Sequence, residues 1–325
     1  MKILITGGCG FIGTALTGSI LQKYKNYKII IIDNFSNSSK SFFKKSIKFL
    51  TKEKFENFNI KIIKGDIKNF NLVLKVSRNC DAIIHLAAST GVDISIKSPY
   101  VDFQNNVFGT FNILEACRIN KIKKIVLASS GAVVGDVNPP INEKILPKPI
   151  SPYGASKLFN EAYSSAYSHS YNISAIALRF SNVYGPGSNF KNSVVSKFIK
   201  DYIFSKKNEI FGDGKQTRDF IYIDDLISAI LKSMLNKKIN NEVFQISTNK
   251  ETKIIHLNKL IVNCLKKLGW SGLKTTFKPI RTGDVKKNYS DNLKALKLLN
   301  WKPHTSLERG IDNTISYFNT FLKNQ

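Results

Sequence analysis

The chain begins with MKILITGGCGFIG (residues 1–13), a short apolar run that breaks into glycines and then resumes as an apolar, helix-like segment. This order predicts a strand, a tight turn and a helix. A phosphate group can approach such a turn only where no Cβ atom intervenes, and the free N–H groups at the helix start then bind it. We therefore expect a nucleotide phosphate against Gly7, Gly8, Gly10 and Gly13.

An acidic residue follows at the spacing that a dinucleotide site requires. Residues 29–32 are all isoleucine and predict a second strand, with Asp33 at its end, about 20 residues past the last glycine. Its carboxylate is placed to hydrogen-bond both hydroxyls of an adenosine ribose. A 2′-phosphate would face this carboxylate, and residues 34–37 contain no arginine, so we expect NAD to bind about tenfold or more tightly than NADP. The alternative is an ordinary βαβ unit with a glycine turn.

Apolar runs followed by small or polar residues indicate four further strands. Because ligands lie against the carboxyl ends of strands in a doubly wound sheet, Asp66 is expected to reach the adenine. Its alternative role is a helix N-cap. Ala87 and Ala88 would let the cofactor lie close to the backbone, whereas His85 is expected to be a packed strand residue. The runs are residues 60–67, 82–88, 124–130 and 173–180.

The remaining elements are read from helical periodicity and from proline. A proline-rich loop at 139–152 cannot be a regular helix or a central strand, and it should lie beside the site. Beyond residue 180 the chain reads as rich in loops, until a strand at 243–247 returns to the sheet. Helical patterns cover residues 38–58, 100–119, 153–170, 223–235, 255–268 and 306–322.

Bulk composition excludes several classes of protein. The chain has 325 residues, 42% of them hydrophobic and 22% charged, which is ordinary for a globular protein. No stretch approaches the roughly 18 apolar residues of a membrane span, so we expect a cytoplasmic protein without a membrane partner. Four widely separated cysteines predict reduced thiols and no metal site. The net charge of +26 comes from lysines spread along the whole chain, so no specific nucleic-acid binding is expected.

Ser130, Tyr153 and Lys157 are the residue types that move a proton off an alcohol while NAD takes a hydride. The i,i+4 spacing places Tyr153 and Lys157 on one helix face. A tyrosine acts as a base near neutrality only if its pKa falls by about 3 units, or roughly 4 kcal/mol, which the lysine and nicotinamide charges favour. The serine hydroxyl would hold the substrate oxygen. The alternative is a chance pairing on one helix.

In this order, TGGCGFIG, the acidic strand end, HLAA, NNVFGT, ASSGAVVG and YGASK resemble the extended short-chain dehydrogenase/reductase family. RFSNVYGPG, GDGKQTRDFIYIDD and RTGDVKKNYSDNLKALKLLNWKP resemble its nucleotide-sugar epimerase and dehydratase branch. The resemblance implies an α/β fold: a Rossmann-type doubly wound parallel sheet with a smaller, mixed α/β carboxyl-terminal substrate domain. The NAD-binding domain would cover 1–180 with a return segment at 221–248, and the nucleotide-sugar domain 181–220 and 249–325.

The resemblance also implies the roles of individual residues. Ser130, Tyr153 and Lys157 would be catalytic. The NAD site would comprise Gly7, Gly10, Phe11, Ile12, Gly13, Asp33, Asn34, Asp66, Ile67, Leu86, Ala87, Ala88, Asn106, Tyr153 and Lys157. The UDP-sugar would contact Ser130, Tyr153, Asn182, Arg218, Arg281, Asp284 and Asn288, with the two arginines on the diphosphate.

Within this branch, dehydratases carry an Asp-Glu pair after the catalytic Ser or Thr, and decarboxylases carry a Glu in that loop. Here Gly131 and Ala132 follow Ser130, so elimination lacks its proton donor and a 4-epimerase is expected. Val134 replaces the tyrosine usual in this motif. One alternative is a dehydratase or reductase of the same family. Another is a non-enzymatic NAD-sensing regulator, and the intact Ser130, Tyr153 and Lys157 argue against this second alternative.

Two further expectations concern assembly and the sugar. Apolar and aromatic residues on several faces of 101–118 and 153–170 predict a homodimer, and in the family these helices pair into an intersubunit bundle. The alternative is that all of these side chains face the core. In the epimerases that the chain resembles, the position matching Asn288 lies beside the sugar's C2 substituent, and a bulky tyrosine there restricts the enzyme to unsubstituted hexoses. Because asparagine is smaller, the resemblance implies that N-acetylated sugars or their uronic acids are accepted.

Overall fold

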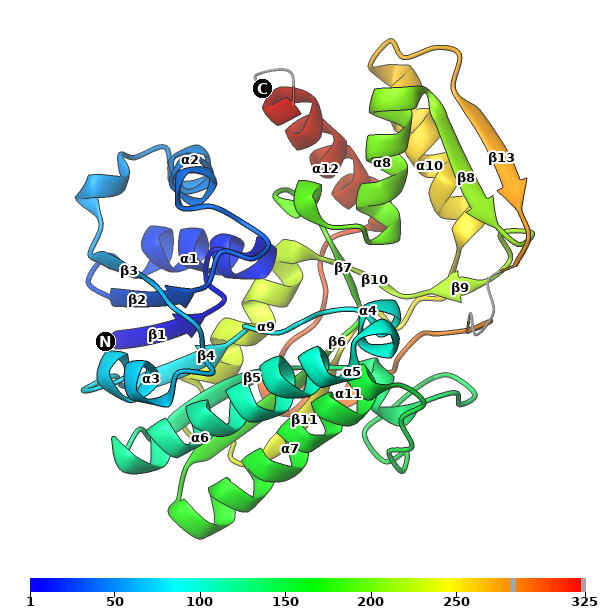
Figure 1. Ribbon diagram of the computed structural model, residues 1–325. Helices are drawn as coiled ribbons and strands as arrows, with labels where there is room; N and C mark the ends of the chain where they lie inside the picture. Colours follow the sequence, from blue (N-terminus) through cyan, green and yellow to red (C-terminus); the bar gives the residue numbers. More distant parts are fainter. Residues whose placement is uncertain (281–284, 323–325) are drawn as a thin grey trace.

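A computed structural model describes residues 1–280 and 285–322, and its centre is a seven-stranded sheet of parallel strands in the order β11-β6-β5-β4-β1-β2-β3 (Figure 1). The order reverses between β1 and β4, so the sheet is doubly wound. Its strands are β1 (Lys2–Thr6), β2 (Lys28–Asp33), β3 (Ile60–Lys64), β4 (Ala82–His85), β5 (Lys124–Ser130), β6 (Ser174–Phe180) and β11 (Glu242–Ile246).

Helices cover both faces of this sheet because its central strands are apolar on both sides. Ile3 and Ile5 of β1 point to the face covered by α1 and α9, whereas Leu4 points to the face of α3, α6 and α7. Figure 1 shows α6 and α7 lying side by side on that second face. These helices are α1 (Phe11–Lys23), α3 (Phe70–Val76), α6 (Gly109–Ile119), α7 (Pro152–Tyr171) and α9 (Ile223–Leu235).

A second group of elements gathers at the carboxyl ends of the strands, drawn in green, yellow and red at the upper right of Figure 1. It contains the parallel pair β8 and β13 and three helices that pack on one another. The short strands β7 and β10 also pair in parallel. The elements are β7 (Asn182–Tyr184), α8 (Val194–Ser205), β8 (Lys207–Phe211), β10 (Phe220–Tyr222), α10 (Ile254–Lys267), β13 (Lys274–Lys278) and α12 (Leu307–Leu322).

Smaller elements complete the chain. α4 and α5 lead into a π-helical segment, and η1, η3 and η4 are 3₁₀ turns. The antiparallel pair of β9 and β12 links the second group of elements to the sheet edge. Their bounds are α2 (Lys40–Thr51), η1 (Phe55–Asn57), α4 (Val92–Lys97), α5 (Pro99–Asp102), η2 (Phe103–Phe108), η3 (Gly131–Val134), η4 (Ser188–Phe190), β9 (Thr217–Arg218), β12 (Thr252–Lys253) and α11 (Leu293–Leu299).

Trp301 connects the carboxyl-terminal segment to α9, which packs on the sheet. Its ring is fully buried and its Nε1–H donates to the carbonyl of Asp225 at 3.0 Å. The Asp225 carboxylate accepts from the backbone N–H groups of His304 and Thr305, each at 3.0 Å. Because these bonds join α9 to the chain that enters α12, the two groups of elements are held together by buried contacts.

The structure confirms the expected Rossmann-type sheet, including the return of 243–247 as β11 beside β6. Two expectations about elements are wrong. The helix expected over 38–58 ends at Thr51, because Lys52 adopts a left-handed φ of 62°. The stretch after residue 180 is not mainly loop, since it contains α8 and β8, whose apolar residues the glycines and proline around them obscured. Within the described residues, no helix is long and apolar enough to cross a membrane.

Candidate active site

The glycine turn after β1 is close-packed, and two of its glycines are required by geometry. Gly7 has φ of 64°, and a Cβ atom there would lie 2.8 Å from the backbone of Ala87 at the end of β4. A Cβ atom on Gly13 would lie 2.5 Å from Cα of Gly8. Contacts this short with backbone atoms cannot be relieved by a side-chain movement. Gly7 and Gly13 therefore let the strand, the turn and the helix approach one another.

The first turn of α1 leaves backbone donors for a phosphate. The helical ladder begins with Thr14 N–H donating to Gly10 O at 2.9 Å, so the N–H groups of Phe11, Ile12 and Gly13 have no partner within the helix. Gly10, the N-cap, offers no side chain to take them. A Cβ atom on Gly10 would meet only Gly7 O, at 3.3 Å. This cradle of free N–H groups without side chains fits the pyrophosphate of a dinucleotide.

Asp33 lies at the end of β2, beside this cradle. Its Oδ2 accepts from Cys9 N–H at 2.9 Å, and its Oδ1 accepts from Phe35 N–H at 2.8 Å. These two bonds fix the carboxylate and leave a further lone pair on each oxygen. The arrangement fits the two hydroxyls of a ribose. Asn34 follows, exposed, with its Oδ1 accepting from Ser36 N–H at 3.0 Å.

Asp66 and the end of β4 line the same edge of the sheet. Asp66 is not a helix N-cap: its Oδ1 accepts from Lys68 N–H at 2.9 Å, and Asn69 caps α3 instead. Ile67 is buried. Leu86, Ala87 and Ala88 are each partly exposed, and Ala87 N–H donates to Thr6 Oγ1 at 3.1 Å. The sequence-predicted cofactor residues of β1 to β4 are thus brought together at the carboxyl ends of their strands.

His85 is a structural residue, as expected. Its Nδ1 lies 2.7 Å from Thr6 Oγ1 and its Nε2 lies 2.9 Å from Thr110 Oγ1, and the ring is buried. Burial, reinforced by the charge of Lys157, lowers the pKa of His85 to about 3. The imidazole is therefore neutral near pH 7 and is occupied at both nitrogens.

Tyr153 and Lys157 stand on the first turns of α7. Pro152 at the first helical position and Ser151, whose Oγ accepts from Gly154 N–H at 3.1 Å, start this helix beside the end of β5. Lys157 is buried and donates from Nζ to Ala128 O at 3.0 Å, while Nζ lies 5.7 Å from the centre of the Tyr153 ring. The cation is thus fixed by the strand and faces the phenol.

Burial disfavours the charged forms of both Tyr153 and Lys157. Burial raises the pKa of Tyr153 to about 12, although a hydrogen bond to Ser130 favours the phenolate. Burial also lowers the pKa of Lys157 to about 8, while the carboxylates of Asp102 and Glu161 favour the charged lysine. Removal of a proton from Tyr153 near neutrality therefore needs additional positive charge, which a bound nicotinamide ring would provide.

Asp102 is a buried residue that the sequence reasoning missed. Its Oδ1 accepts from Asn106 Nδ2 at 2.7 Å, and Asn106 also binds Ser89 through N–H and C=O at 2.8 and 2.9 Å. Asn106 lies in the π-helical segment η2, a type of distortion that is frequent at functional sites. These bonds hold the loop after β4 beside Lys157. The acid at the start of the NNVFGT helix was the available signal.

A second buried group also escaped notice. Arg179 of β6 donates from Nε and Nη2 to the Glu161 carboxylate at 2.8 and 2.7 Å, and Ser129 Oγ donates to Glu161 Oε1 at 2.5 Å. Arg179 and Glu161 are both at least nine-tenths buried. This ion pair ties α7 to β5 and β6 one turn beyond Lys157, so it positions the face of α7 that carries Tyr153 and Lys157.

Of the further residues expected to hold a nucleotide-sugar, the structure describes Asn182, Arg218 and Asn288. Asn182, at the start of β7, donates from Nδ2 to Asp219 O at 3.1 Å. Arg218 donates from Nη1 to Thr217 O and Val285 O, each at 2.7 Å. Asn288 is partly exposed. The expected Arg281 and Asp284 lie outside the described residues.

The segment that carries Asn288 is fixed at both ends. Lys286 O accepts from Thr217 N–H at 2.9 Å, and Tyr289 O accepts from Ile141 N–H at 2.9 Å. Asn288 therefore lies between the Arg218 strand and the loop that follows Ser130. In that loop Val134 is fully buried against Val133 and Ile141, so it packs inside the loop.

Comparisons with known proteins agree with this architecture. The family model of GDP-mannose 4,6 dehydratase matches residues 4–314. A putative UDP-glucose 4-epimerase of Methanocaldococcus jannaschii is 38% identical over 97% of each chain. The UDP-N-acetylglucosamine 4-epimerase of Methanobrevibacter ruminantium, solved with UDP-N-acetylmuramic acid, has a TM-score of 0.88 and 30% identity over 98% of each chain.

A further solved structure shares the fold of this chain. The UDP-glucuronic acid 4-epimerase of Bacillus cereus, solved with UDP-glucuronic acid and NAD, has a TM-score of 0.85 and 33% identity, covering 99% of this chain and 100% of its own. The matches span both the sheet and the second group of elements. The chain therefore belongs to the GDP-mannose 4,6-dehydratase family of the extended short-chain dehydrogenases/reductases.

Proposed function

We propose that this chain catalyses the NAD-dependent 4-epimerisation of a UDP-sugar. The observation that carries the proposal is that Tyr153 and Lys157 share one edge of the sheet with the phosphate cradle of α1. The 3₁₀ turn after Ser130 begins with Gly131 and Ala132, so it offers no carboxyl group to protonate a leaving hydroxyl. Oxidation and reduction at one carbon remain without an elimination step.

When bound, NAD supplies the redox chemistry, accepting the C4 hydride of the sugar and returning it to the opposite face. Tyr153, as phenolate, takes the proton of the C4 hydroxyl while that carbon becomes a ketone, and it returns a proton when the ketone is reduced. Lys157 stabilises the phenolate, and Ser130 donates a hydrogen bond to the C4 oxygen. The product differs from the substrate only in its C4 configuration, so no external reductant is consumed.

The nucleotide of the substrate is assigned to residues 181–220 and 249–325, opposite the NAD-binding residues 1–180 and 221–248. Arg218 supports this assignment, because two backbone carbonyls hold its guanidinium beside the site. With Arg281 and Asp284, it would bind the UDP diphosphate and ribose, and Asn182 would contact the diphosphate. Arginine suits this role because its planar fork matches phosphate oxygens.

Asn288 is proposed to select the sugar at its C2 position. The segment around it is anchored at Lys286 and Tyr289, so a larger side chain cannot be moved aside by the backbone. We expect UDP-N-acetylhexosamines or their uronic acids to be used at least as well as UDP-glucose and UDP-galactose. A pocket contact of this size discriminates by roughly 10- to 200-fold.

The proposed selection by Asn288 is tested by measuring kcat/KM for N-acetylated and for plain UDP-hexoses, in the parent and in Asn288→Tyr. Lys287→Tyr is the matched control, because Lys287 is the exposed neighbour. The tyrosine at 288 should reduce use of the N-acetylated sugars and leave the plain sugars largely unaffected. Equal use of both sugar classes by the parent and by Asn288→Tyr would remove this position from substrate selection.

A homodimer is proposed to form through α6, α7 and the helical turns before them. The view that all of these side chains face the core is wrong, since Phe103, Phe108 and Tyr163 are 55%, 45% and 40% exposed. Tyr163 stacks on Phe159 at 4.2 Å between ring centres, forming a flat aromatic surface. A patch of this kind usually marks an interface. Light scattering at micromolar concentration should give twice the mass of the chain.

The reaction itself is tested by incubating the purified protein with single UDP-hexoses without added NADH. The expected result is an equilibrium mixture of each accepted sugar and its C4 epimer, resolved by NMR. Tyr153→Phe, which keeps the ring and removes the hydroxyl, serves as the control. A product lacking one water molecule, or no conversion of any UDP-sugar, would contradict the proposal.

A further inference from the structure

The chain between β7 and α8 crosses from the second group of elements to the NAD side of the molecule. We call residues 186–191 the crossing segment. Gly187 packs against Phe11, because a Cβ atom added to Gly187 would lie 3.5 Å from the Phe11 ring. Phe190 meets the ring of Phe42 edge-on at 4.5 Å between centres. The crossing segment therefore touches both α1 and α2.

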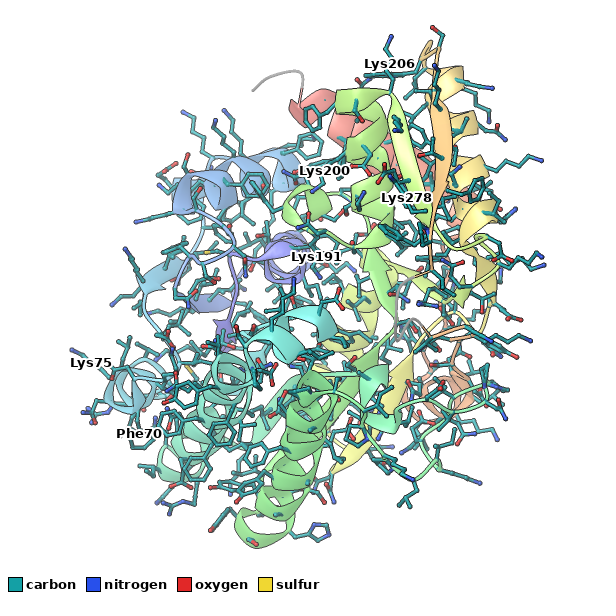
Figure 2. All side chains as sticks on the ribbon, turned by 45° about the vertical axis from the view of Figure 1, so that its right-hand side comes forward. Phe70, Lys75, Lys191, Lys200, Lys206 and Lys278 are labelled. Carbon is teal, nitrogen blue, oxygen red and sulfur yellow. The ribbon has the colours of Figure 1, made fainter. Side chains whose placement is uncertain are left out.

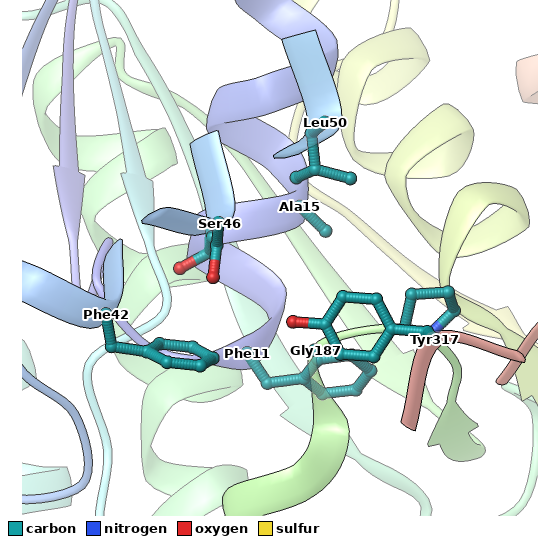
Figure 3. Close-up of a pocket in the computed structure, with 9 residues that line it drawn as sticks. Phe11, Ala15, Phe42, Ser46, Leu50, Gly187 and Tyr317 are labelled. Carbon is teal, nitrogen blue, oxygen red and sulfur yellow. The ribbon is translucent and has the colours of Figure 1, made fainter. Parts of the chain in front are cut away.

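Figure 3 shows the apolar pocket that lies behind this crossing, between α1, α2, α12 and the turn at Pro186 and Gly187. Phe11, Phe42 and Tyr317 converge on it, and none of the described residues that line it is charged. The pocket is therefore a packing seam between the two groups of elements. The charged side chain of the crossing segment, Lys191, lies at its other end.

α8 holds the crossing segment in place. Lys200 donates from Nζ to Lys191 O at 2.9 Å and to Asn192 Oδ1 at 3.2 Å. Ser196 Oγ donates to Ser188 Oγ at 2.9 Å, and Ser188 Oγ donates to Gly185 O at 2.7 Å. Contacts with α8 therefore fix the backbone of Lys191, and its side chain is directed toward Phe11.

The Lys191 ammonium lies over the ring of Phe11, with Nζ 5.6 Å from the ring centre. Among the described residues it has no carboxylate partner, in contrast to Lys197, which pairs with Asp201 within α8. Partial burial lowers the pKa of Lys191, whose side chain remains partly exposed. The ammonium is therefore accessible to a ligand that carries the opposite charge.

Phe11 is also the first residue of α1, whose N–H groups at positions 11–13 are left for an anion. The Lys191 ammonium thus lies over the ring of the residue that begins α1, near the positive end of that helix. Figure 2 labels Lys191 close to α1, whereas Lys206 and Lys75 lie at the outer edges of the molecule in this view. An anion bound at the start of α1 would supply the counter-charge that Lys191 lacks among the described residues.

We propose that Lys191 binds the diphosphate of a nucleotide at the first turn of α1. It thereby adds a charged contact from the second group of elements to a site built mainly from the sheet side. Two ligands carry this chemistry, the pyrophosphate of NAD and the diphosphate of UDP. The UDP source rests on the proposed function, whereas the NAD source does not. The crossing segment would then act as a clamp that joins both groups of elements to one ligand.

The test uses the full chain with Lys191→Met, which keeps the side-chain length and removes the charge. Lys191→Arg keeps the charge, and Lys75→Met makes the same charge change at an exposed lysine of α3, at the edge of the molecule in Figure 2. Dissociation constants are measured for NAD with NAD-stripped protein and for UDP with NAD-loaded protein. Adenosine and uridine, which lack the diphosphate, are measured alongside them, and circular dichroism and thermal melting verify the fold.

Lys191→Met should weaken binding of NAD, of UDP or of both by about 10- to 100-fold, the effect of one charge-assisted hydrogen bond. Adenosine and uridine should bind with unchanged affinity, and the loss should shrink as salt is added. Lys191→Arg should remain close to the parent, as should Lys75→Met. A loss confined to NAD identifies the pyrophosphate, and a loss confined to UDP identifies the substrate diphosphate. If folded Lys191→Met binds both ligands as the parent does, or loses adenosine and uridine equally, the inference is wrong. If Lys191→Met does not fold, the NAD and UDP affinities of Lys191→Gln decide in the same way.

Discussion

Replacing Lys157 by methionine should move the pH dependence of the reaction, because its ammonium faces the Tyr153 ring at 5.7 Å. At an effective dielectric constant of about 20, two unit charges at roughly this separation interact by about 3 kcal/mol, which corresponds to ~2 pKa units. The lysine cation stabilises the phenolate, so its removal raises the pKa of Tyr153. The acid limb of the rate profile should therefore move to higher pH by ~2 units, and the rate at a fixed pH on that limb should fall by about 100-fold.

The assay is kcat/KM for one UDP-sugar across a pH series, measured on the parent and on Lys157→Met with saturating NAD. Lys157 also donates to Ala128 O, so melting curves must show that the variant folds. Above the shifted limb the variant should recover much of its rate, because the phenolate then forms without help. A profile with an unmoved acid limb and a uniformly reduced rate would refute this electrostatic role and leave Lys157 a positioning role only.

Three further changes test other parts of the account. Tyr153→Phe should keep the fold and bound NAD but reduce turnover by about 10²-fold or more, since a general base contributes that much; near-parental turnover would exclude it. Gly13→Ala should abolish NAD retention, because its Cβ would lie 2.5 Å from Cα of Gly8; a folded variant with normal NAD content by absorbance would contradict this. Glu161→Gln should lower the free energy of unfolding by about 3–5 kcal/mol in urea titrations, because it leaves Arg179 buried without its counter-charge; an unchanged midpoint would show that the pair is dispensable.

Local chemistry in the sequence was sufficient to predict the parallel sheet. Each central strand is an unbroken apolar run that ends in glycine, aspartate or small residues, and such runs fit only a sheet covered on both faces. The glycine turn and the strand-end acid at Asp33 follow from the same reasoning. The return of β11 was also visible, because an apolar run follows the strongly amphipathic helix α9.

The parts that sequence reasoning missed depend on contacts distant in the chain. α8 is followed after one residue by β8, and its apolar face packs against β8 and α10, contacts that are recognised only in the fold. The Arg179 and Glu161 pair joins a strand to a helix, and neither residue belongs to a recognisable local pattern. Asp102 differs, since its i,i+4 relation to Asn106 was present in the sequence and was overlooked.

The most direct test of the central claim uses a UDP-hexose carrying deuterium at C4, incubated with the protein in ordinary water without added NADH. If Tyr153 and bound NAD act at C4 as proposed, the hydride leaves and returns within one active site. The epimeric product should then retain its deuterium at C4, as read by NMR and mass spectrometry. Loss of the label to water, or label found at another carbon of a dehydrated product, would contradict the account.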